Sequence, residues 1–310
     1  MPTVRTISVI NQKGGVGKTT TVANLGAALA DRGRRVCLVD LDPQAHLTLH
    51  FGLEPGGSPA GAYDILTGDA LPPDASVRVR PELHVIPSVI DLAATEVELS
   101  GTIGREQILA DKLRDAPPPA DITLIDCAPS LGLLTLNALA ASDEVLIPLQ
   151  AHFLALQGLG KLLETVLLVQ RRINPRLRVA GVVLCMHESN TRLAAEVLDD
   201  LKQFVADARG TDVPWADMVV FDTVIRRNVK LAECPSYGTT IFEYEPASHG
   251  ADDYNALADE FIARAAPSQA ADAGSPPPEP LVEPNAPDAA PPENGPPPGP
   301  AQGTPTPDGP

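Results

Sequence analysis

Residues 11–20 read Asn-Gln-Lys-Gly-Gly-Val-Gly-Lys-Thr-Thr, after an aliphatic run at 4–10 and at the start of a helical pattern at 18–31. The three glycines of this stretch let the backbone curl so that successive N–H groups point inward around an anion. The N-terminus of the following helix adds the positive end of its dipole. The stretch therefore predicts a loop that binds a polyphosphate between a strand and a helix.

Two lysines stand in this loop. Lys18 is expected to supply a mobile cation to the β- and γ-phosphates, and the Thr19 hydroxyl can ligate Mg²⁺. The loop departs from the common pattern G-x-x-x-x-G-K-[ST], because Gln12 occupies the first glycine position and Lys13 follows it. A second cation beside the phosphates costs free energy unless an anionic group lies next to it. Lys13 is either a solvated loop lysine or a group that reaches a nucleotide, including one held by a second subunit. The predicted nucleotide-binding residues of the loop are Lys13, Gly14, Gly15, Val16, Gly17, Lys18, Thr19 and Thr20.

Short aliphatic runs alternate with longer helical patterns along the chain. The expected strands are Val4–Ile10, Val36–Leu41, Leu83–Pro87, Ile122–Cys127, Val145–Leu149, Val179–Leu184 and Met218–Ile225. The expected helices cover residues 18–31, 104–115, 131–141, 154–173, 192–208 and 251–265. This alternation predicts an α/β fold with a doubly wound, mostly parallel sheet, helices on both faces and ligands at the carboxyl ends of the strands. Residues 52–80, rich in Gly, Pro and Asp, are expected to form a surface excursion.

The final segment differs in composition from the rest. Residues 267–310 hold 16 of the 33 prolines and six acidic residues, and they contain no lysine or arginine. Such a segment cannot bury enough apolar surface to offset the entropy lost on ordering. We therefore expect one domain at 1–266 and a disordered, Pro/Ala-rich acidic tail at 267–310.

Charge and cysteine usage exclude several classes of protein. Residues 1–266 carry 34 acidic and 23 basic side chains, a net charge of −11, so DNA binding would need a local basic patch. The four cysteines form no Cys-x-x-Cys pair, which favours buried thiols in a reducing compartment. No apolar run approaches the ~18 residues of a membrane span, and the N-terminus lacks a signal-peptide pattern. We expect a soluble cytoplasmic protein with no membrane contact.

Three aspartates follow expected strands, at the edge where the phosphates would lie. Asp40 and Asp42 stand two residues apart and share a face if the strand geometry persists, and Asp126 follows the hydrophobic run 122–125. A carboxylate there can hold Mg²⁺ through its water ligands or orient an attacking water. The alternatives are an Asp-Pro turn at Asp42 and a turn or helix N-cap at Asp126. The predicted metal ligands are Thr19, Asp42 and Asp126.

Five segments of the chain match a single known pattern. They are Lys-Gly-Gly-Val-Gly-Lys-Thr-Thr at 13–20, Val-Asp-Leu-Asp-Pro-Gln at 39–44, Leu-Ile-Asp-Cys-Ala-Pro-Ser-Leu-Gly at 124–132, Ile-Pro-Leu-Gln at 147–150 and Arg-Asn-Val-Lys-Leu at 227–231. Together they resemble the deviant Walker A ATPases, specifically the ParA/Soj-type chromosome-partition proteins. The resemblance spans residues 4–265. It implies a P-loop NTPase fold, ATP and Mg²⁺ as cofactors, ATP hydrolysis with weak basal activity, and a homodimer in the ATP-bound state.

The resemblance also implies roles for single residues. Lys13 would cross the dimer interface to the partner's nucleotide, and Asp42 would activate the hydrolytic water, so the implied catalytic residues are Lys13, Lys18 and Asp42. Family members hold adenine with a Pro-Arg-Asn segment, which reads Arg-Arg-Asn at 226–228 here, so Arg226 and Asn228 are the implied base contacts. None of the six lysines follows Asn or Thr, so the Asn/Thr-Lys-x-Asp sequence that commonly reads guanine is absent and adenine is favoured.

Basic residues suggest how DNA would be bound. Arg226, Arg227 and Lys230 place three cations within five residues, and Arg192 opens the expected helix before them. On one face of a dimer they would give salt-sensitive, sequence-independent contacts to phosphates, whereas the alternative is ordinary solvated positions. The resemblance favours the first, with Arg192, Arg227 and Lys230 as the predicted DNA-binding residues. Many relatives carry this arginine two positions before 192.

The function implied by the resemblance is an ATP-hydrolysing switch for chromosome or plasmid partitioning. Its dimer would bind nonspecific double-stranded DNA on the nucleoid and leave it when a ParB/Spo0J-type centromere-binding protein stimulates hydrolysis. Two alternatives stay open. One is a ParA-like ATPase that positions a protein complex or organelle on the nucleoid. The other is a small-molecule enzyme of the dethiobiotin-synthetase or cobyrinate-amidase kind.

Overall fold

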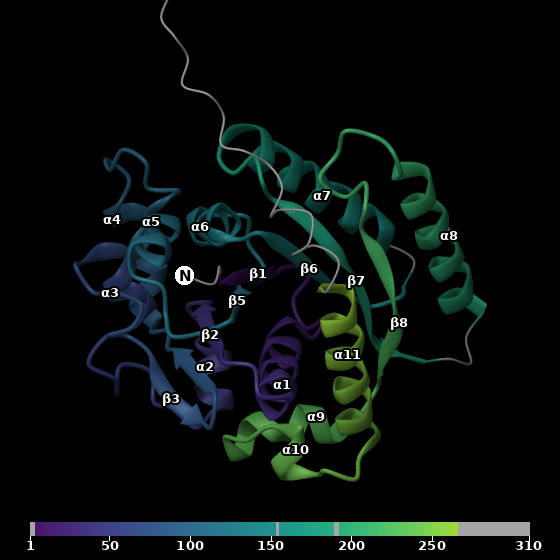
Figure 1. Cartoon of the computed structure of the whole chain (residues 1–310), viewed down its shortest axis with the longest axis horizontal. Coiled ribbons are helices and arrows are strands. Elements are labelled where there is room, and N and C mark those ends of the chain that lie inside the picture. Colours follow the sequence, from purple (N-terminus) through teal and green to yellow (C-terminus); the bar gives the residue numbers. More distant parts are fainter. Residues whose placement is uncertain (1–3, 153–154, 189–191, 266–310) are drawn as a thin grey trace, which may run out of the picture. The chain divides into compact units, whose positions relative to one another are not determined.

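The computed structural model describes residues 4–152, 155–188 and 192–265 (Figure 1). The expected tail at 267–310 lies outside these residues, so its disorder and the domain boundary stay predictions. The described chain forms an eight-stranded sheet in the order β3-β4-β2-β5-β1-β6-β7-β8. All neighbouring pairs are parallel except β3 and β4, which are antiparallel. The predicted α/β fold with a mostly parallel sheet is confirmed.

The strands have definite bounds. They are β1 (Arg5–Val9), β2 (Val36–Leu41), β3 (Val77–Arg80), β4 (Leu83–Ile86), β5 (Ile122–Cys127), β6 (Glu144–Leu149), β7 (Arg178–His187) and β8 (Val219–Arg226). The expected strands and helices are confirmed, and their ends differ from the expected ones by at most four residues. The long helices are α1 (Lys18–Asp31), α5 (Ile108–Asp115), α6 (Leu133–Ala141), α7 (Ala155–Arg172), α8 (Arg192–Ala208) and α11 (His249–Ala265).

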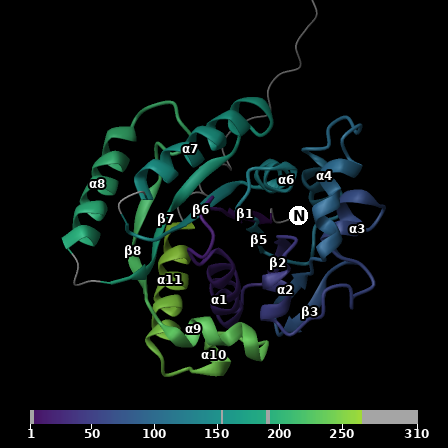
Figure 2. The same ribbon diagram turned by 180° about the vertical axis from the view of Figure 1, so that it is seen from behind.

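Helices cover both faces of the sheet because alternate strand residues are apolar on each side. In β2, Val36 and Leu38 pack with α1 in one buried cluster, whereas Cys37, Val39 and Leu41 join the cluster on the other face. The first face carries α1 and α11, which lie side by side in Figures 1 and 2. The second face carries α6, α7 and α8. A sheet covered in this way leaves its carboxyl edge as the place for a ligand.

The expectation for residues 52–80 was partly wrong. This segment holds α3 (Ala62–Thr67) and the edge strand β3, whose Val77 pairs with Val85 of β4. Other short elements that no periodicity predicted are α2 (His46–His50), η1 (Ile90–Ala94), α4 (Thr95–Glu98), α9 (Val229–Glu233), η2 (Cys234–Tyr237) and α10 (Ile241–Tyr244). Helices of one or two turns show no repeat long enough to detect.

Two further expectations can be compared with the structure. All four cysteines are free and buried, and burial raises the pKa of Cys37 and of Cys185 to about 12. Within the described ranges, no helix is both long enough and apolar enough to pass through a lipid bilayer.

Substituting two glycines, one in a crowded strand and one in an open helix, tests how tightly the sheet is packed. A Cβ on Gly181 of β7 would lie 2.5 Å from the Val219 carbonyl oxygen of β8, so Gly181→Ala should lower the free energy of unfolding by about 1–3 kcal/mol. Gly158 in α7 has open space around it, so Gly158→Ala should raise that free energy by about 0.5–1 kcal/mol through helix propensity. Urea unfolding of both variants measures the difference. Equal stabilities would mean that β8 moves aside at no cost.

Candidate functional site

Parallel register brings the predicted site residues to one edge of the sheet. Asp126 at the end of β5 is paired with Val9 of β1 on one side and with Asp40 of β2 on the other. The loop after β1 turns sharply into α1, with positive φ angles of 72° at Gly15 and 95° at Gly17. Only glycine adopts such angles without strain, which explains why the loop needs these residues. The loop therefore lies at the same edge of the sheet as Asp126, and phosphate binding by the loop stays a prediction.

Lys18 is buried at the first turn of α1, with 7% of its surface exposed. Its Nζ atom donates a hydrogen bond to the Lys13 carbonyl oxygen at 3.4 Å, so the side chain folds back under the loop. Burial lowers the pKa of Lys18, and the negative charges of Asp126 and Asp42 oppose that shift. An ammonium group held in this way is ready to meet an anion that enters the loop.

Thr19 and Asp126 form the centre of the site. The Thr19 hydroxyl donates to Asp126 Oδ2 at 2.7 Å. Asp126 is fully buried, and its Oδ1 atom has no hydrogen-bond partner among the residues that the structure describes. Burial, and after it the charge of Asp40, raises the pKa of Asp126 well above its ordinary value. A buried carboxylate oxygen without a partner beside a threonine hydroxyl is a donor set that suits a hard divalent cation.

Such a cation would take few ligands from the protein. Within the described ranges, no three His, Cys, Asp or Glu residues come together as a metal-binding group. Mg²⁺ keeps most of its water shell and binds through one or two carboxylates plus phosphate oxygens. The residues present therefore fit Mg²⁺ better than an ion that needs an all-protein cage.

Asp40 acts as a structural anchor for the chain that follows β2. Its Oδ2 accepts hydrogen bonds from the Thr48 amide at 2.8 Å and from the Thr48 hydroxyl at 2.7 Å, and its Oδ1 accepts one from the Asp42 amide at 3.1 Å. Burial raises the pKa of Asp40 to about 6. These bonds fix the turn that carries Asp42 and the helix α2 that follows.

Asp42 lies at the same edge, with 8% of its surface exposed. Its Oδ1 accepts a hydrogen bond from the Gln44 amide at 2.9 Å, and its carbonyl oxygen accepts one from the Ser88 hydroxyl at 2.8 Å. The turn expected from the Asp-Pro sequence is therefore present, and it holds the carboxylate beside Lys18, on whose pKa the charge of Asp42 acts. A turn role and a catalytic role are compatible at this residue.

Lys13 occupies a different environment from Lys18. It is exposed, and its Nζ lies 2.7 Å from Nε2 of His152 and 3.4 Å from Oε1 of Gln150. Sequence reasoning missed both partners: Gln150 stood in a matched segment without a role, and His152 was not considered. The sequence offers only a weak signal for these two residues. They follow the end of β6 and come close to Lys13 only when the chain folds.

The two predicted base contacts make structural interactions. Arg226 at the end of β8 pairs with Asp253 of α11, with its Nε atom 2.9 Å from Oδ1. Asn228 caps α9, since its Oδ1 accepts a hydrogen bond from the Lys230 amide at 2.9 Å. The implied adenine contacts therefore stay predictions, and Arg226 would have to leave a carboxylate to meet a base.

Two of the predicted DNA-binding residues, Arg227 and Lys230, have acidic neighbours. Arg227, with 73% of its side chain exposed, pairs with Glu188 at 3.1 Å, and Lys230 pairs with Glu233 at 2.9 Å. Arg192 is the first residue of α8, but its side chain lies outside the part that the structure describes. Two of the three cations are thus exposed or half-exposed and engaged by carboxylates.

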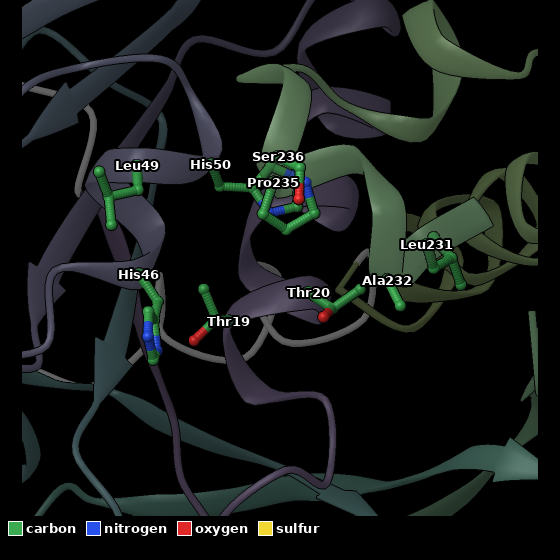
Figure 3. A pocket seen from close by; sticks show the side chains of 9 residues that line it. All are labelled: Thr19, Thr20, His46, Leu49, His50, Leu231, Ala232, Pro235 and Ser236. Atoms are coloured by element: carbon green, nitrogen blue, oxygen red, sulfur yellow. The ribbon is translucent and has the colours of Figure 1, made fainter. Parts of the chain in front are cut away.

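A cavity of about 390 Å³ adjoins the first turn of α1. Figure 3 shows Thr19 and Thr20 on one side of it, with side chains of α2 and of the α9–η2 segment around the rest. His50, one of the lining residues, is fully buried, and burial lowers its pKa to about 4. Neither of its ring nitrogens has a hydrogen-bond partner in the part of the chain that the structure describes. Arg226 and Asn228 are not among the lining residues.

Comparisons with known proteins agree with this geometry. The model of a family described as an AAA domain matches residues 4–179. The sporulation initiation inhibitor protein Soj of Bacillus subtilis is 46% identical over 83% of this chain and 98% of its own length. The chromosome partitioning protein ParA of Caulobacter vibrioides is 41% identical over 86% of this chain and 97% of its own.

A solved structure is also similar. The cobyrinic acid a,c-diamide synthase of Mycobacterium smegmatis, solved with a bound ATP analog and magnesium, gives a TM-score of 0.71 and 38% identity over 86% of this chain and 97% of that one. The family model covers more than half of the chain, and relatives above 40% identity match almost their full length. The chain therefore belongs to the ParA/Soj-type ATPases, a family of P-loop chromosome-partition proteins.

Proposed function

We propose that this protein hydrolyses ATP as a switch in the partitioning of a chromosome or plasmid. One observation carries the proposal: the loop holds two lysines in opposite environments, Lys18 buried under the loop and Lys13 exposed on it. A buried lysine serves the triphosphate of its own protomer. An exposed one can extend to the triphosphate of a facing protomer, which links nucleotide binding to dimerisation.

The site residues divide the work of hydrolysis. Loop N–H groups and Lys18 bind the phosphates, and Asp42 orients the attacking water from a turn fixed by Ser88 and Gln44. Thr19, Asp126 and Asp42 would hold Mg²⁺, which when bound neutralises charge on the triphosphate. The M. smegmatis relative, solved with an ATP analog and magnesium, supports both ligands.

The dimer would bind DNA without reading its sequence. Arg192, Arg227 and Lys230 are the proposed contacts, and a net charge of −11 on residues 1–266 makes this binding weak and dependent on a local patch. We further propose that a ParB/Spo0J-type partner stimulates hydrolysis and so releases the dimer from the nucleoid. The name of the Caulobacter vibrioides relative, a chromosome partitioning protein, supports a role in partitioning. The same cycle could instead position a protein complex or organelle, and the identity of the cargo-bound partner would separate the two.

A second candidate function comes from the similarity to the cobyrinic acid a,c-diamide synthase. An enzyme of that class consumes ATP in step with a metabolite, whereas a switch hydrolyses ATP slowly until DNA and a partner are added. The higher identity to Soj, 46% against 38%, favours the switch. Turnover with cobyrinic acid and an amide donor, compared with turnover with DNA, distinguishes the two functions.

Asp126 makes stability depend on pH in a definite direction. Its pKa is raised in the folded protein, so the folded state holds this proton more tightly than the unfolded chain. The stability that this proton provides is complete below the ordinary carboxyl pKa and is lost as the pH rises through the raised value. Asp126→Asn should therefore raise the free energy of unfolding above that window by about 1–3 kcal/mol and leave it unchanged at low pH. Urea unfolding at pH 4 and pH 8 tests this; a less stable variant at pH 8 contradicts it.

The same variant should lose its response to magnesium. Wild-type protein with ATP should gain stability when Mg²⁺ is added, because a ligand that binds only the folded state shifts the equilibrium toward it. Asp126→Asn removes a carboxylate ligand, so the added gain from Mg²⁺ should disappear while a part of the gain from ATP remains. Thermal unfolding with ATP, with and without Mg²⁺, provides the measurement.

Lys13→Ala should bind nucleotide but fail to dimerise. Light scattering with Mg²⁺ and a nonhydrolysable ATP analog should give the mass of a dimer for the wild type and of a monomer for this variant. Lys161→Ala removes another exposed lysine, from α7, and should behave as the wild type. A dimeric Lys13→Ala protein would refute the role across the interface.

Asp42→Ala should trap a dimer that stays on DNA. Hydrolysis should fall by about a hundredfold or more, because the water loses its orienting carboxylate, while ATP-dependent retention on DNA persists at low salt and weakens at high salt. The exposed Asp74→Ala is the control. The measurement is the amount of protein retained on DNA with ATP, ADP and a nonhydrolysable analog at two salt concentrations. Hydrolysis by Asp42→Ala at the wild-type rate would mean that another residue orients the attacking water.

A further inference from the structure

We propose that His152 and Gln150 hold Lys13 within its own protomer, and that this contact opposes the transfer of Lys13 to a facing protomer. His152 is then a positioning residue that sets how readily the protein dimerises. The inference rests on the proposed role of Lys13 across the dimer interface. It adds a restraint, and a dependence on pH, that this role alone does not contain.

The contact defines the chemical state of His152. A lysine ammonium group has three N–H donors and no acceptor, so the imidazole must accept the hydrogen bond at Nε2 over the 2.7 Å that separates the two atoms. The proton of neutral His152 then lies on Nδ1. Gln150 Oε1, 3.4 Å from the same Nζ, is a second neutral acceptor. Lys13 thus has two acceptors in its own chain.

The backbone of Lys13 is tied to the same strand as its side chain. The Lys13 amide donates to Asn11 Oδ1 at 3.0 Å, and Asn11 Nδ2 donates to the Pro148 carbonyl oxygen of β6 at 2.7 Å. Gln150 and His152 follow that same strand. Main chain and side chain are therefore both held against the end of β6, and reaching another protomer requires Lys13 to give up its side-chain contact.

Neutral partners make this contact reversible. Arg227 and Lys230 are paired with carboxylates, but Lys13 meets an imidazole and an amide. A hydrogen bond from a charged donor to a neutral acceptor at an exposed position changes the equilibrium between the bonded and the released side chain by about a factor of ten. That is enough to restrain the lysine in the free monomer and too little to compete with a triphosphate.

Protonation of His152 breaks the contact. The imidazolium ion has no acceptor nitrogen and repels the ammonium group of Lys13. Burial, and after it the charge of Lys13, lowers the pKa of His152 below its ordinary value of 6.5. Gln150, which follows β6 and contacts the same Lys13 Nζ, is uncharged, and the first turn of α7, which follows His152, carries no acidic residue to offset Lys13. The restraint is therefore present above this lowered pKa and lost as the pH falls through it.

Two substitutions separate the restraint from its titration. His152→Ala removes the acceptor, and His152→Gln keeps an acceptor that cannot titrate. Each of the two protomers loses a contact that stabilises about tenfold, so at pH 7.5, with Mg²⁺ and a nonhydrolysable ATP analog, His152→Ala should dimerise at an about hundredfold lower protein concentration than the wild type. At pH 5.5 the wild type should approach His152→Ala, whereas His152→Gln should change little with pH. A wild-type midpoint that matches His152→Ala at both pH values, or weaker dimerisation of His152→Ala, overturns the proposal.

A second measurement keeps the two proposals apart. The pKa of His152, followed by NMR and assigned by its loss in His152→Gln, should rise toward 6.5 in Lys13→Ala, because the neighbouring cation is gone. An unchanged pKa overturns the contact itself. If Lys13→Ala dimerises normally while the pKa of His152 rises, the contact exists and the proposed role of Lys13 across the interface fails.

Discussion

The site depends on a carboxylate that the sheet buries without a full set of hydrogen bonds. Asp126 lies between β1 and β2 in parallel register, fully out of contact with solvent, and within the described ranges only its Oδ2 has a hydrogen-bond partner. Burying a charge in this way costs free energy unless a counter-charge is supplied. A divalent cation held by Asp126, as proposed above, would offset that cost.

Hydrogen bonds within the chain fix the residues around Asp126. Asp40 uses its oxygens on Thr48 and on the Asp42 amide, so it orders the turn after β2 instead of serving as a ligand. Ser88 holds the same turn from the chain after β4. Preorganisation of this kind matters for phosphoryl transfer, where positioning contributes more than a strong base.

Sequence alone predicted the fold and the centre of the site because both follow from local patterns. Apolar strand runs, the glycine loop and aspartates at strand ends predicted that Lys18, Thr19 and Asp126 lie at one edge of the sheet, where the structure has them, while their binding roles stay predictions. What could not be predicted came from contacts between distant segments: β3 is an edge strand of four residues, and His152 meets Lys13 across 139 positions of sequence. Similarly, Asp253 engages Arg226 and gives it a structural role that its position in a motif did not indicate.

The ion pairs on Arg227 and Lys230 have a consequence for any encounter with a polyanion. Each cation already has a carboxylate neighbour, Glu188 or Glu233. A DNA phosphate must therefore displace this carboxylate before it can contact the cation. Added salt weakens the ion pair within the chain as well as the contact with the phosphate. Counterion release per basic side chain would then be smaller than for an unpaired lysine or arginine, and the number of contacts inferred from an ionic-strength titration would underestimate the true number.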